Sequence, residues 1–300
     1  MKHDVNGVLL LDKPAGFTSN EALQIVKNLF KASKAGHTGS LDPSASGMLP
    51  ICFGEATKFS QFLLEASKLY HVTGKLGETT ASGDAENEVL KRRAVENISI
   101  ETFDMILSQF RGEILQTPPM YSAIKYKGQP LYKLARQGIE VKRNSREINV
   151  YKLQLLEFAN NFAVFEIYCS KGTYIRTLIV DVGEALGCGA HVVSLRRLAV
   201  GPYQAYMMVT LDKLRELAIQ KSYHHKLNKY LLPIESMLVG MPEVILTRDM
   251  IHYAILGQAI VVSHVPKSGW VQLKDKNGNF LGVGEVLLGE KISPRRMIKF

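Results

Sequence analysis

One carboxylate stands alone in a loop of small residues at positions 36–50. The loop reads Gly-His-Thr-Gly-Ser-Leu-Asp-Pro-Ser-Ala-Ser-Gly-Met-Leu-Pro, and Asp42 is its single acidic residue. The proline that follows restricts Asp42 to extended geometry, and the glycines let a ligand approach the backbone closely. Asp42 could therefore act as a nucleophile or a base. An Asx-type turn, in which the carboxylate accepts nearby N–H groups, is the simpler interpretation for an Asp taken by itself.

Other common site chemistries find little support in the sequence. The loop lacks the Gly-x-x-x-x-Gly-Lys-Ser/Thr pattern of a P-loop and the Gly-x-Gly-x-x-Gly pattern of a dinucleotide site. Cys52, Cys169 and Cys188 are far apart and show no Cys-x-x-Cys spacing. This spacing argues against a disulfide framework or a thiolate metal site, and it is typical of a reducing compartment.

Composition limits the class of protein. The chain has 300 residues, 46% hydrophobic and 22% charged, and a formal net charge of +9. This is the composition of an ordinary globular protein, so disorder and small disulfide scaffolds are excluded. No apolar run is long enough to span a bilayer, and the N-terminal apolar stretch is too short for a signal peptide. We therefore expect a soluble, cytoplasmic protein. The positive charge favours a polyanionic partner, although an enzyme with a basic surface would carry the same charge.

Basic and aromatic residues interleave most densely at positions 121–146. Cations can contact phosphates and tyrosine rings can stack on bases, so this pattern is typical of a nucleic-acid surface. A solvated helix face with half-buried tyrosines would show the same composition. The window contains Lys125, Lys127, Lys133, Arg136, Lys142, Arg143 and Arg146 against Glu140, with Tyr121, Tyr126 and Tyr132.

Hydrophobic periodicity predicts the elements that must position these residues. A capping box at 18–21 starts a helix that ends near residue 31. The 35–47 segment is predicted to be a loop, and 221–229 a linker. Strands are predicted at 7–12, 48–53, 68–76, 148–158, 162–170 and 192–200, and helices at 57–66, 102–110, 173–186 and 210–220. Beyond residue 233 the pattern predicts a helix at 248–256 and strands at 259–265, 270–274 and 280–286, with a hairpin signal at Asn277-Gly278.

A series of motifs along nearly the whole chain resembles the TruB-type tRNA pseudouridine synthases. The series includes the 36–50 loop and keeps the family's order. Two positions depart from the family pattern, Ala81 and Asn87. The motifs are DKPAGFTS at 12–19, KLY at 68–70, TPPMYSAIK at 117–125, KGTYIRTL at 171–178, GAHVVSLRR at 189–197 and PRR at 294–296.

This resemblance implies an α+β pseudouridine synthase fold, with a mixed, largely antiparallel sheet, flanking helices and a central cleft. Residues 1–229 would form the catalytic domain, with a basic RNA-binding insertion near 117–146. Residues 230–300 would form a small β-rich, PUA-like RNA-binding domain. The implied partner is the T stem-loop of tRNA, without a membrane or an obligatory protein partner, and the protein is expected to be a monomer.

The implied reaction converts uridine-55 of the T loop to pseudouridine after the base leaves its stack. A C–N bond breaks, a C–C bond forms to the same sugar carbon and nothing leaves, so no cofactor or metal is required. Asp42 would be the nucleophile. It could add to the base, add to the sugar carbon, or stabilise charge during glycal formation, and the sequence does not choose among these routes.

The resemblance also assigns roles to other residues. Arg176 would pair with Asp42, the alternative being a phosphate contact. Tyr70 would lie against the uracil and could relay a proton, the alternative being cross-strand packing. His37 would insert where the base leaves the stack. The remaining substrate-binding residues would be Tyr174, Leu195 (by itself a core residue) and Lys13, and the phosphate-binding residues would be Lys125, Lys127, Lys133 and Arg136.

Two rival functions come from other classes. A tRNA-binding folding chaperone would not need Asp42, Tyr70 and Arg176 together, although catalysis could be secondary in a protein that does both. A guide-RNA-dependent pseudouridine synthase usually carries charged tails, and no such run occurs here. A stand-alone enzyme is therefore the favoured interpretation.

Overall fold

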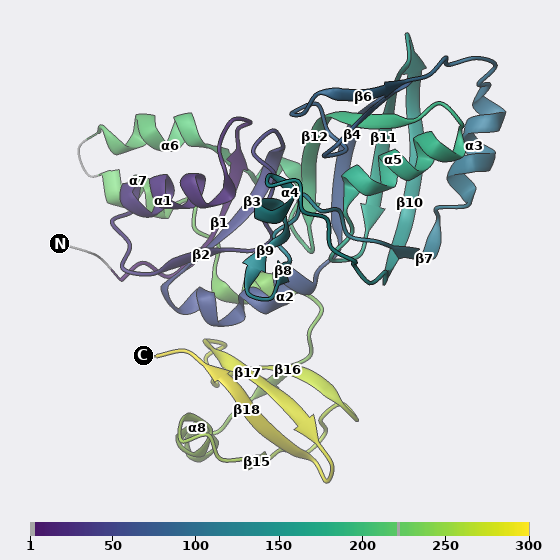
Figure 1. The fold of residues 1–300 in the computed structure, drawn as a ribbon. Coiled ribbons are helices and arrows are strands. Elements are labelled where there is room, and N and C mark those ends of the chain that lie inside the picture. Colours follow the sequence, from purple (N-terminus) through teal and green to yellow (C-terminus); the bar gives the residue numbers. More distant parts are fainter. Residues whose placement is uncertain (1–3, 221–222, 300) are drawn as a thin grey trace.

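A computed structural model of the chain describes residues 4–220 and 223–299, which form two large sheets of unequal size and two short two-stranded sheets (Figure 1). The larger sheet has nine strands. Their spatial order is β13 (Val209–Thr210), β1 (Gly7–Lys13), β3 (Ser46–Phe53), β12 (Ala190–Val200), β4 (Lys68–Leu76), β11 (Phe162–Cys169), β10 (Arg146–Ala159) and β7 (Gly112–Gln116), with β2 (Ala35–His37) paired to β3.

The pairing of these strands is mixed and mostly antiparallel, as predicted. Among the described residues of this sheet, only the β1–β13 and β3–β12 pairs run parallel. The β3–β12 contact consists of two residue pairs, Ser46 with Arg196 and Gly47 with Arg197. Neighbouring pairs such as β4–β11 are much longer. The sheet therefore has two halves that meet at a narrow joint.

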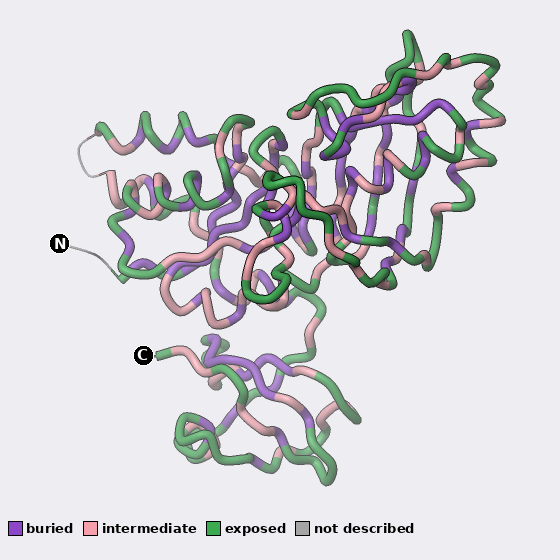
Figure 2. The backbone as a smooth tube through the Cα atoms, in the orientation of Figure 1, coloured by how far each residue is buried: buried purple, intermediate pink, exposed green. Residues whose placement is uncertain are grey.

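Helices cover each half of the sheet separately (Figure 1). The β1–β3 half packs against α1 (Ser19–Leu29), α6 (Leu211–Ala218) and α7 (Tyr223–Asn228), which share a buried cluster around Leu11, Val26 and Leu214. The β4–β10 half packs against α3 (Ile100–Ser108) and α5 (Ile175–Ala185), through a cluster that includes Phe103, Phe165 and Leu178. Figure 2 shows buried backbone concentrated in the strands between these layers.

The sequence predicted several elements closely. The predicted strand at 68–76 is β4, with Tyr70, Val72 and Gly74 on its buried face. The predicted hairpin is β10 and β11, which pair antiparallel. The capping box is also present, since Thr18 accepts a hydrogen bond from the Glu21 N–H and Glu21 accepts one from the Thr18 N–H.

Three predictions differ from the structure. The segment expected to be a loop at 35–47 begins with β2, because Ala35–His37 pairs with the C-terminal end of β3. The helix expected at 57–66 is a 3-10 helix, η1 (Gly54–Phe59), followed by α2 (Ser60–Glu65). The expected linker contains α7, whose Leu227 is fully buried against the core. Residues 221–222 of that predicted linker lie outside the described residues.

The smaller sheet confirms the β-rich C-terminal prediction. It packs beneath η1 and α2, where the Phe59 and Phe280 rings lie 5.3 Å apart and the Phe62 and Trp270 rings 5.4 Å apart. Residues 234–238 form the 3-10 helix η3 (Ile234–Leu238) and join the same cluster. The sheet's order is β14 (Glu243–Ile245), β16 (Gly269–Lys274), β17 (Phe280–Leu287), β18 (Lys291–Met297) and β15 (Ile260–Val261), with α8 (Arg248–Ile255) alongside.

The remaining elements are short. Between β7 and β10 the insertion folds into β8 (Lys125–Tyr126), β9 (Gln129–Pro130) and α4 (Leu131–Ala135). A further hairpin, β5 (Glu78–Thr80) with β6 (Val89–Arg92), lies beyond β4, and the 3-10 helix η2 (Ala205–Met207) follows β12. Within residues 4–220 and 223–299, no helix is long and apolar enough to cross a membrane.

Candidate active site

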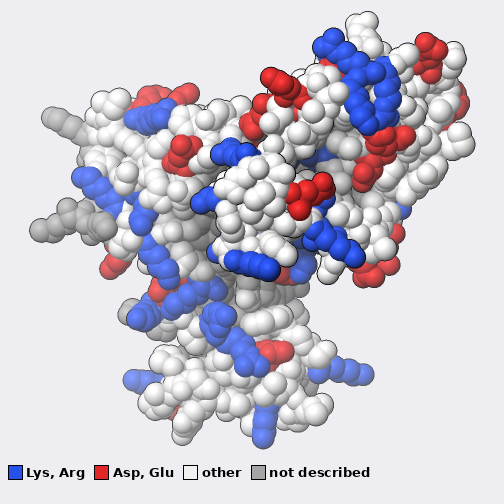
Figure 3. Space-filling view, in the orientation of Figure 1, with Lys and Arg blue, Asp and Glu red and all other residues white. Residues whose placement is uncertain are grey.

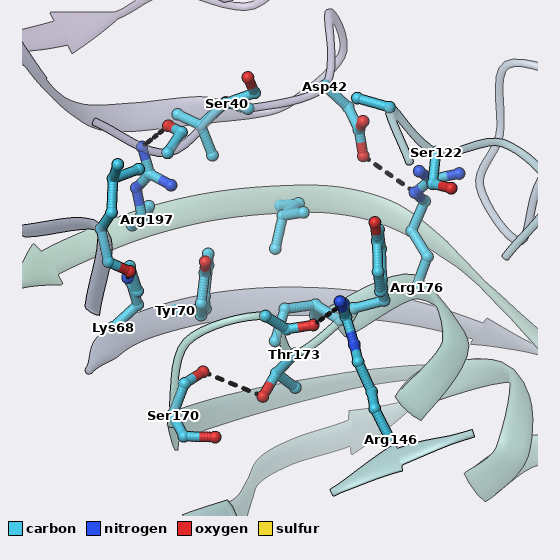
Figure 4. Close-up of a pocket in the computed structure, with 18 residues that line it drawn as sticks. Ser40, Asp42, Lys68, Tyr70, Ser122, Arg146, Ser170, Thr173, Arg176 and Arg197 are labelled. Atoms are coloured by element: carbon cyan, nitrogen blue, oxygen red, sulfur yellow. Dashed lines mark hydrogen bonds and ion pairs between the residues drawn. The ribbon is translucent and has the colours of Figure 1, made fainter. Parts of the chain in front are cut away.

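A cavity of about 350 Å³ opens where the two halves of the large sheet meet (Figure 4). Its size is ordinary for a ligand site. Five of the residues predicted for the site line this cavity: Asp42, Tyr70, Tyr174, Arg176 and Leu195. They come from the loop before β3, from β4, from the start of α5 and from β12, so only folding brings them together.

A second cavity of about 570 Å³ adjoins the first and shares Asp42 and Arg176 with it. His37 lines this second cavity, together with Tyr132 and Arg136 of the insertion. Burial, followed by the positive charge of Arg197, lowers the pKa of His37. The His37 ring is therefore neutral at ordinary pH. It lies on the side of the site that faces the basic insertion.

The loop that carries Asp42 is held from the segment at 12–19. The Ser19 hydroxyl accepts from the Leu41 N–H at 2.8 Å and donates to the Leu41 carbonyl at 3.0 Å. Lys13 is fully buried, and its ammonium donates to the carbonyls of Phe17 at 2.7 Å and Pro43 at 3.4 Å. Lys13 lines neither cavity. The structure thus places Lys13 behind the Asp42 loop, where it holds the backbone.

Arg176 connects Asp42 to two other segments. Its Nε lies 2.9 Å from Asp42 Oδ2, and its Nη1 lies 3.4 Å from Asp84 Oδ2. Nη1 also donates to the Ser82 carbonyl at 2.8 Å, and Nη2 donates to the Tyr121 carbonyl at 2.7 Å. The side chain is 6% exposed. Because the guanidinium is buried and already bonded on three sides, it orients Asp42 better than it could bind a phosphate.

Opposing influences set the ionisation of Asp42. Burial in the cavity raises its pKa, the positive charge of Arg176 lowers it, and the carboxylates of Asp84 and Glu86 raise it. The net direction is upward. The Asp42 side chain nevertheless keeps 41% of its surface exposed. It is therefore a carboxylate that a ligand can reach, and Arg176 favours its charged form.

Tyr70 lies on β4 with its hydroxyl toward the middle of the cavity (Figure 4). Burial raises the pKa of the phenol, while the nearby Arg197 opposes that shift. The phenol is therefore neutral at ordinary pH and can donate or accept a hydrogen bond. Tyr174, just before α5, is held by Gln116, which accepts from the Tyr174 N–H at 2.8 Å and donates to its carbonyl at 3.0 Å.

Sequence reasoning did not assign a role to Arg197, Asp84 or Ser19. Arg197 is 1% exposed and donates to the carbonyls of Met48 at 2.7 Å and Gly39 at 2.9 Å, so it closes the joint between β12 and β3. At that joint a Cβ on Gly47 would lie 2.2 Å from the Arg197 carbonyl oxygen, so only glycine fits. Arg197 and Ser19 stand inside the quoted motifs, and that position was the available signal for them.

The four predicted phosphate-binding residues, Lys125, Lys127, Lys133 and Arg136, are exposed on the insertion. The Arg136 guanidinium lies over the Tyr132 ring at 5.6 Å. In Figure 3, Lys and Arg side chains gather around the insertion and continue toward the small sheet. In the described part of the chain, no group of three His, Cys, Asp or Glu side chains could hold a metal ion.

Family models cover nearly the whole chain. Residues 27–175 match "TruB family pseudouridylate synthase (N terminal domain)". Residues 176–239 match "tRNA pseudouridylate synthase B C-terminal domain", and residues 242–298 match "Pseudouridine synthase II TruB, C-terminal".

Curated relatives are similar over nearly their full lengths. A protein named tRNA pseudouridine synthase B from Coxiella burnetii (strain RSA 493 / Nine Mile phase I) is 55% identical over 298 residues, which is 99% of this chain and 96% of the relative. A protein of the same name from Stutzerimonas stutzeri (strain A1501) is 50% identical over 299 residues, covering 100% of this chain and 97% of the relative.

Solved structures agree on the fold. A chain in the crystal structure of a Cbf5-Nop10-Gar1 complex matches with a TM-score of 0.75 and 26% identity, covering 98% of this chain and 85% of that chain. A chain of the archaeal box H/ACA sRNP Nop10-Cbf5 complex matches with a TM-score of 0.73 at 24% identity, covering 98% and 86%. The expected fold class, including the small PUA-like domain, is thereby confirmed.

Proposed function

The chain belongs to the TruB family of pseudouridylate synthases, and we propose that it isomerises uridine-55 in the T loop of tRNA to pseudouridine. The names of its curated relatives support tRNA as the substrate. The observation that carries the catalytic assignment is the ion pair between Asp42 and the buried Arg176 at the edge of a cavity lined by Tyr70. This geometry holds one reachable carboxylate ready for nucleophilic attack.

In the proposed reaction, His37 occupies the place of the extruded uridine, and the base enters the first cavity. Asp42 serves as the nucleophile while the bond from C1′ to N1 breaks. The uracil turns, and a bond forms from C1′ to C5. The proton that C5 loses balances the one that N1 gains, and we assign its relay to the Tyr70 hydroxyl. Because the atoms of the substrate are only rearranged, the reaction needs no added group.

The RNA would be held outside the cavity. We assign phosphate contacts to the insertion near 117–146 of the catalytic domain, which spans residues 1–229. The domain at 230–300 would bind further parts of the RNA. We also propose that the protein is a monomer and works in the cytoplasm without an obligatory protein partner. The exposure of the four basic residues on the insertion supports this division.

The test is tritium release from a T stem-loop RNA labelled at C5 of the target uridine. Wild-type protein should release tritium, and Asp42→Asn should lose at least about a thousandfold in rate, because an amide cannot replace the carboxylate nucleophile. Asp212→Asn is the matched control, since Asp212 is 91% exposed on α6 and should behave as wild type. Pseudouridine formation by Asp42→Asn would overturn the assignment.

A further inference from the structure

Four cationic side chains line the first cavity. Three of them each have two or more hydrogen-bond or ion-pair partners within the protein. The Lys68 ammonium donates to three carbonyls at the end of α2. Arg176 is held by two carboxylates. Arg197 is 1% exposed and donates to two carbonyls. The fourth cation is Arg146, at the start of β10.

Arg146 differs from the other three in its partners. Its Nη2 donates to the Gly172 carbonyl, and among residues 4–220 and 223–299 no carboxylate pairs with it. Its Nε–H is buried without any acceptor. A guanidinium N–H that lacks a partner in a low-dielectric site is costly, and native proteins usually supply the missing acceptor in some state. The free donor and the uncompensated charge both indicate an anionic ligand.

The Arg146 guanidinium is also held in a fixed position. Its guanidinium lies over the Tyr174 ring at 4.9 Å from the centroid, and Tyr174 is held by Gln116 through two backbone hydrogen bonds. Figure 4 shows the side chain rising from β10 with its guanidinium toward the cavity. A stacked, planar guanidinium keeps its remaining N–H groups pointing in a set direction, which suits recognition of phosphate oxygens.

Carboxylates near the cavity would repel an anionic ligand, so such a ligand would need a cation beside it. Asp42 lines this cavity, Asp84 and Glu86 line the adjoining second cavity, and Arg176 is paired with Asp42 and Asp84. An RNA backbone that follows its base into the site meets repulsion from these carboxylates. An unpaired cation at the mouth of the cavity would offset that repulsion.

Accepting the proposed function, we propose that Arg146 binds a phosphate oxygen adjacent to the target uridine and positions that nucleotide over the cavity. The residue lies outside the exposed set formed by Lys125, Lys127, Lys133 and Arg136. Those four would bind phosphates away from the reacting nucleotide, whereas Arg146 would contact the nucleotide that reacts. The phosphate on either the 5′ or the 3′ side of the uridine presents the same chemistry.

The experiment measures equilibrium binding of a T stem-loop RNA over a series of salt concentrations, with tritium release recorded in parallel. Arg146→Gln should weaken binding by about ten- to a hundredfold. It should also reduce the magnitude of the slope of log K against log salt by about 0.7, the value for one single-strand contact. Arg146→Lys should lose less, because it keeps the charge. RNAs with a methylphosphonate at the 5′ or the 3′ linkage identify the phosphate, since the correct one abolishes the difference between Arg146→Gln and wild type.

Lys152→Gln is the control, because Lys152 lies further along β10 and is paired with Glu166. It should keep wild-type affinity and slope. If Arg146 only supports Tyr174 and Gly172, Lys and Gln variants will be equally impaired at an unchanged salt slope, and the proposal is wrong. A wild-type protein that binds the RNA but releases no tritium would instead overturn the proposed function, while the binding series still decides the role of Arg146.

Discussion

Asp42 depends on contacts from three separate segments of the chain. Arg176 pairs with its carboxylate, and two other segments hold its loop at Leu41, Pro43 and Ser44. None of these contacts is local in sequence, so the reactivity of one carboxylate is a property of the assembled fold. The loop contacts are Ser19 with Leu41, Lys13 with Pro43, and Glu86, which accepts from the Ser44 N–H at 3.1 Å.

The same neighbours predict a pH dependence. Burial raises the pKa of Asp42 above its ordinary value of 3.8, and Glu86 contributes to that rise. Only the ionised carboxylate is a nucleophile, so the single-turnover rate should fall as pH drops through a midpoint above 3.8. In Glu86→Gln the like charge is gone while an oxygen acceptor for Ser44 remains. The midpoint should therefore move to lower pH.

A pH series of single-turnover rates for wild type and Glu86→Gln checks this. Glu88→Gln serves as the control, because Glu88 is a nearby exposed carboxylate that does not contribute to the pKa of Asp42. A midpoint that stays in place or rises in Glu86→Gln would show that the charge of Glu86 does not act on Asp42.

At the scale of elements, α1 and the Asp42 loop are joined through one hydroxyl. Ser19 is 4% exposed, and it satisfies both backbone groups of Leu41. In Ser19→Ala the buried Leu41 N–H and carbonyl lose their partner, which costs about 1–3 kcal/mol. We expect a lower melting temperature and a slower chemical step. Thermal denaturation and single-turnover kinetics measure both, with Ser33→Ala on an exposed position as control. Unchanged rates would mean that the loop does not need this contact.

The insertion is the element expected to bind RNA without taking part in the chemistry. Lys125 is exposed at the start of β8, and Arg136 is exposed at the C-terminal cap of α4. In the Lys125→Ala/Arg136→Ala double variant, tRNA binding at moderate salt should weaken about ten- to a hundredfold through lost phosphate contacts. The maximal single-turnover rate should stay near that of wild type. A large loss in that rate would contradict the assignment of the insertion to RNA binding alone.

On the scale of the whole molecule, the two sheets share one hydrophobic cluster. Phe280 and Val283 of the small sheet are buried with Phe59 of the large part, and the chain's single tryptophan, Trp270, packs on Phe62 at the same junction. Such a shared cluster favours unfolding of both parts in one transition. Trp270 fluorescence then reports directly on the junction.

Phe280→Ala tests that coupling. Removal of this buried ring should destabilise the protein by about 3–5 kcal/mol. In urea, the Trp270 fluorescence transition should coincide with the circular dichroism transition in wild type and should precede it in Phe280→Ala. Leu288→Ala is the control, since Leu288 is 95% exposed in the turn between β17 and β18. Coincident transitions in the variant would show that the sheets do not depend on Phe280 for their association.

The sequence by itself determined the strands and helices with strong periodicity, the capping box and the chemistry-bearing residues that stand in motifs. Those features are local, because side-chain period, turn residues and caps act within a few positions. Only the tertiary structure decided that Lys13 lies behind the loop, that residues 223–228 are a packed helix, and that Arg197 and Asp84 complete the site.

The physical reason is that burial and pairing depend on the segments that meet in space. Arg146 and Arg176 have the same side chain, yet Arg176 is bonded to two carboxylates while Arg146 has no anionic partner within the described chain. The family resemblance assigned Arg176 to Asp42, whereas Arg146 stood only in the basic window at 121–146 without a role of its own. Their surroundings, assembled from β10, α5 and three loops, give one the task of orienting Asp42 and leave the other free for a ligand.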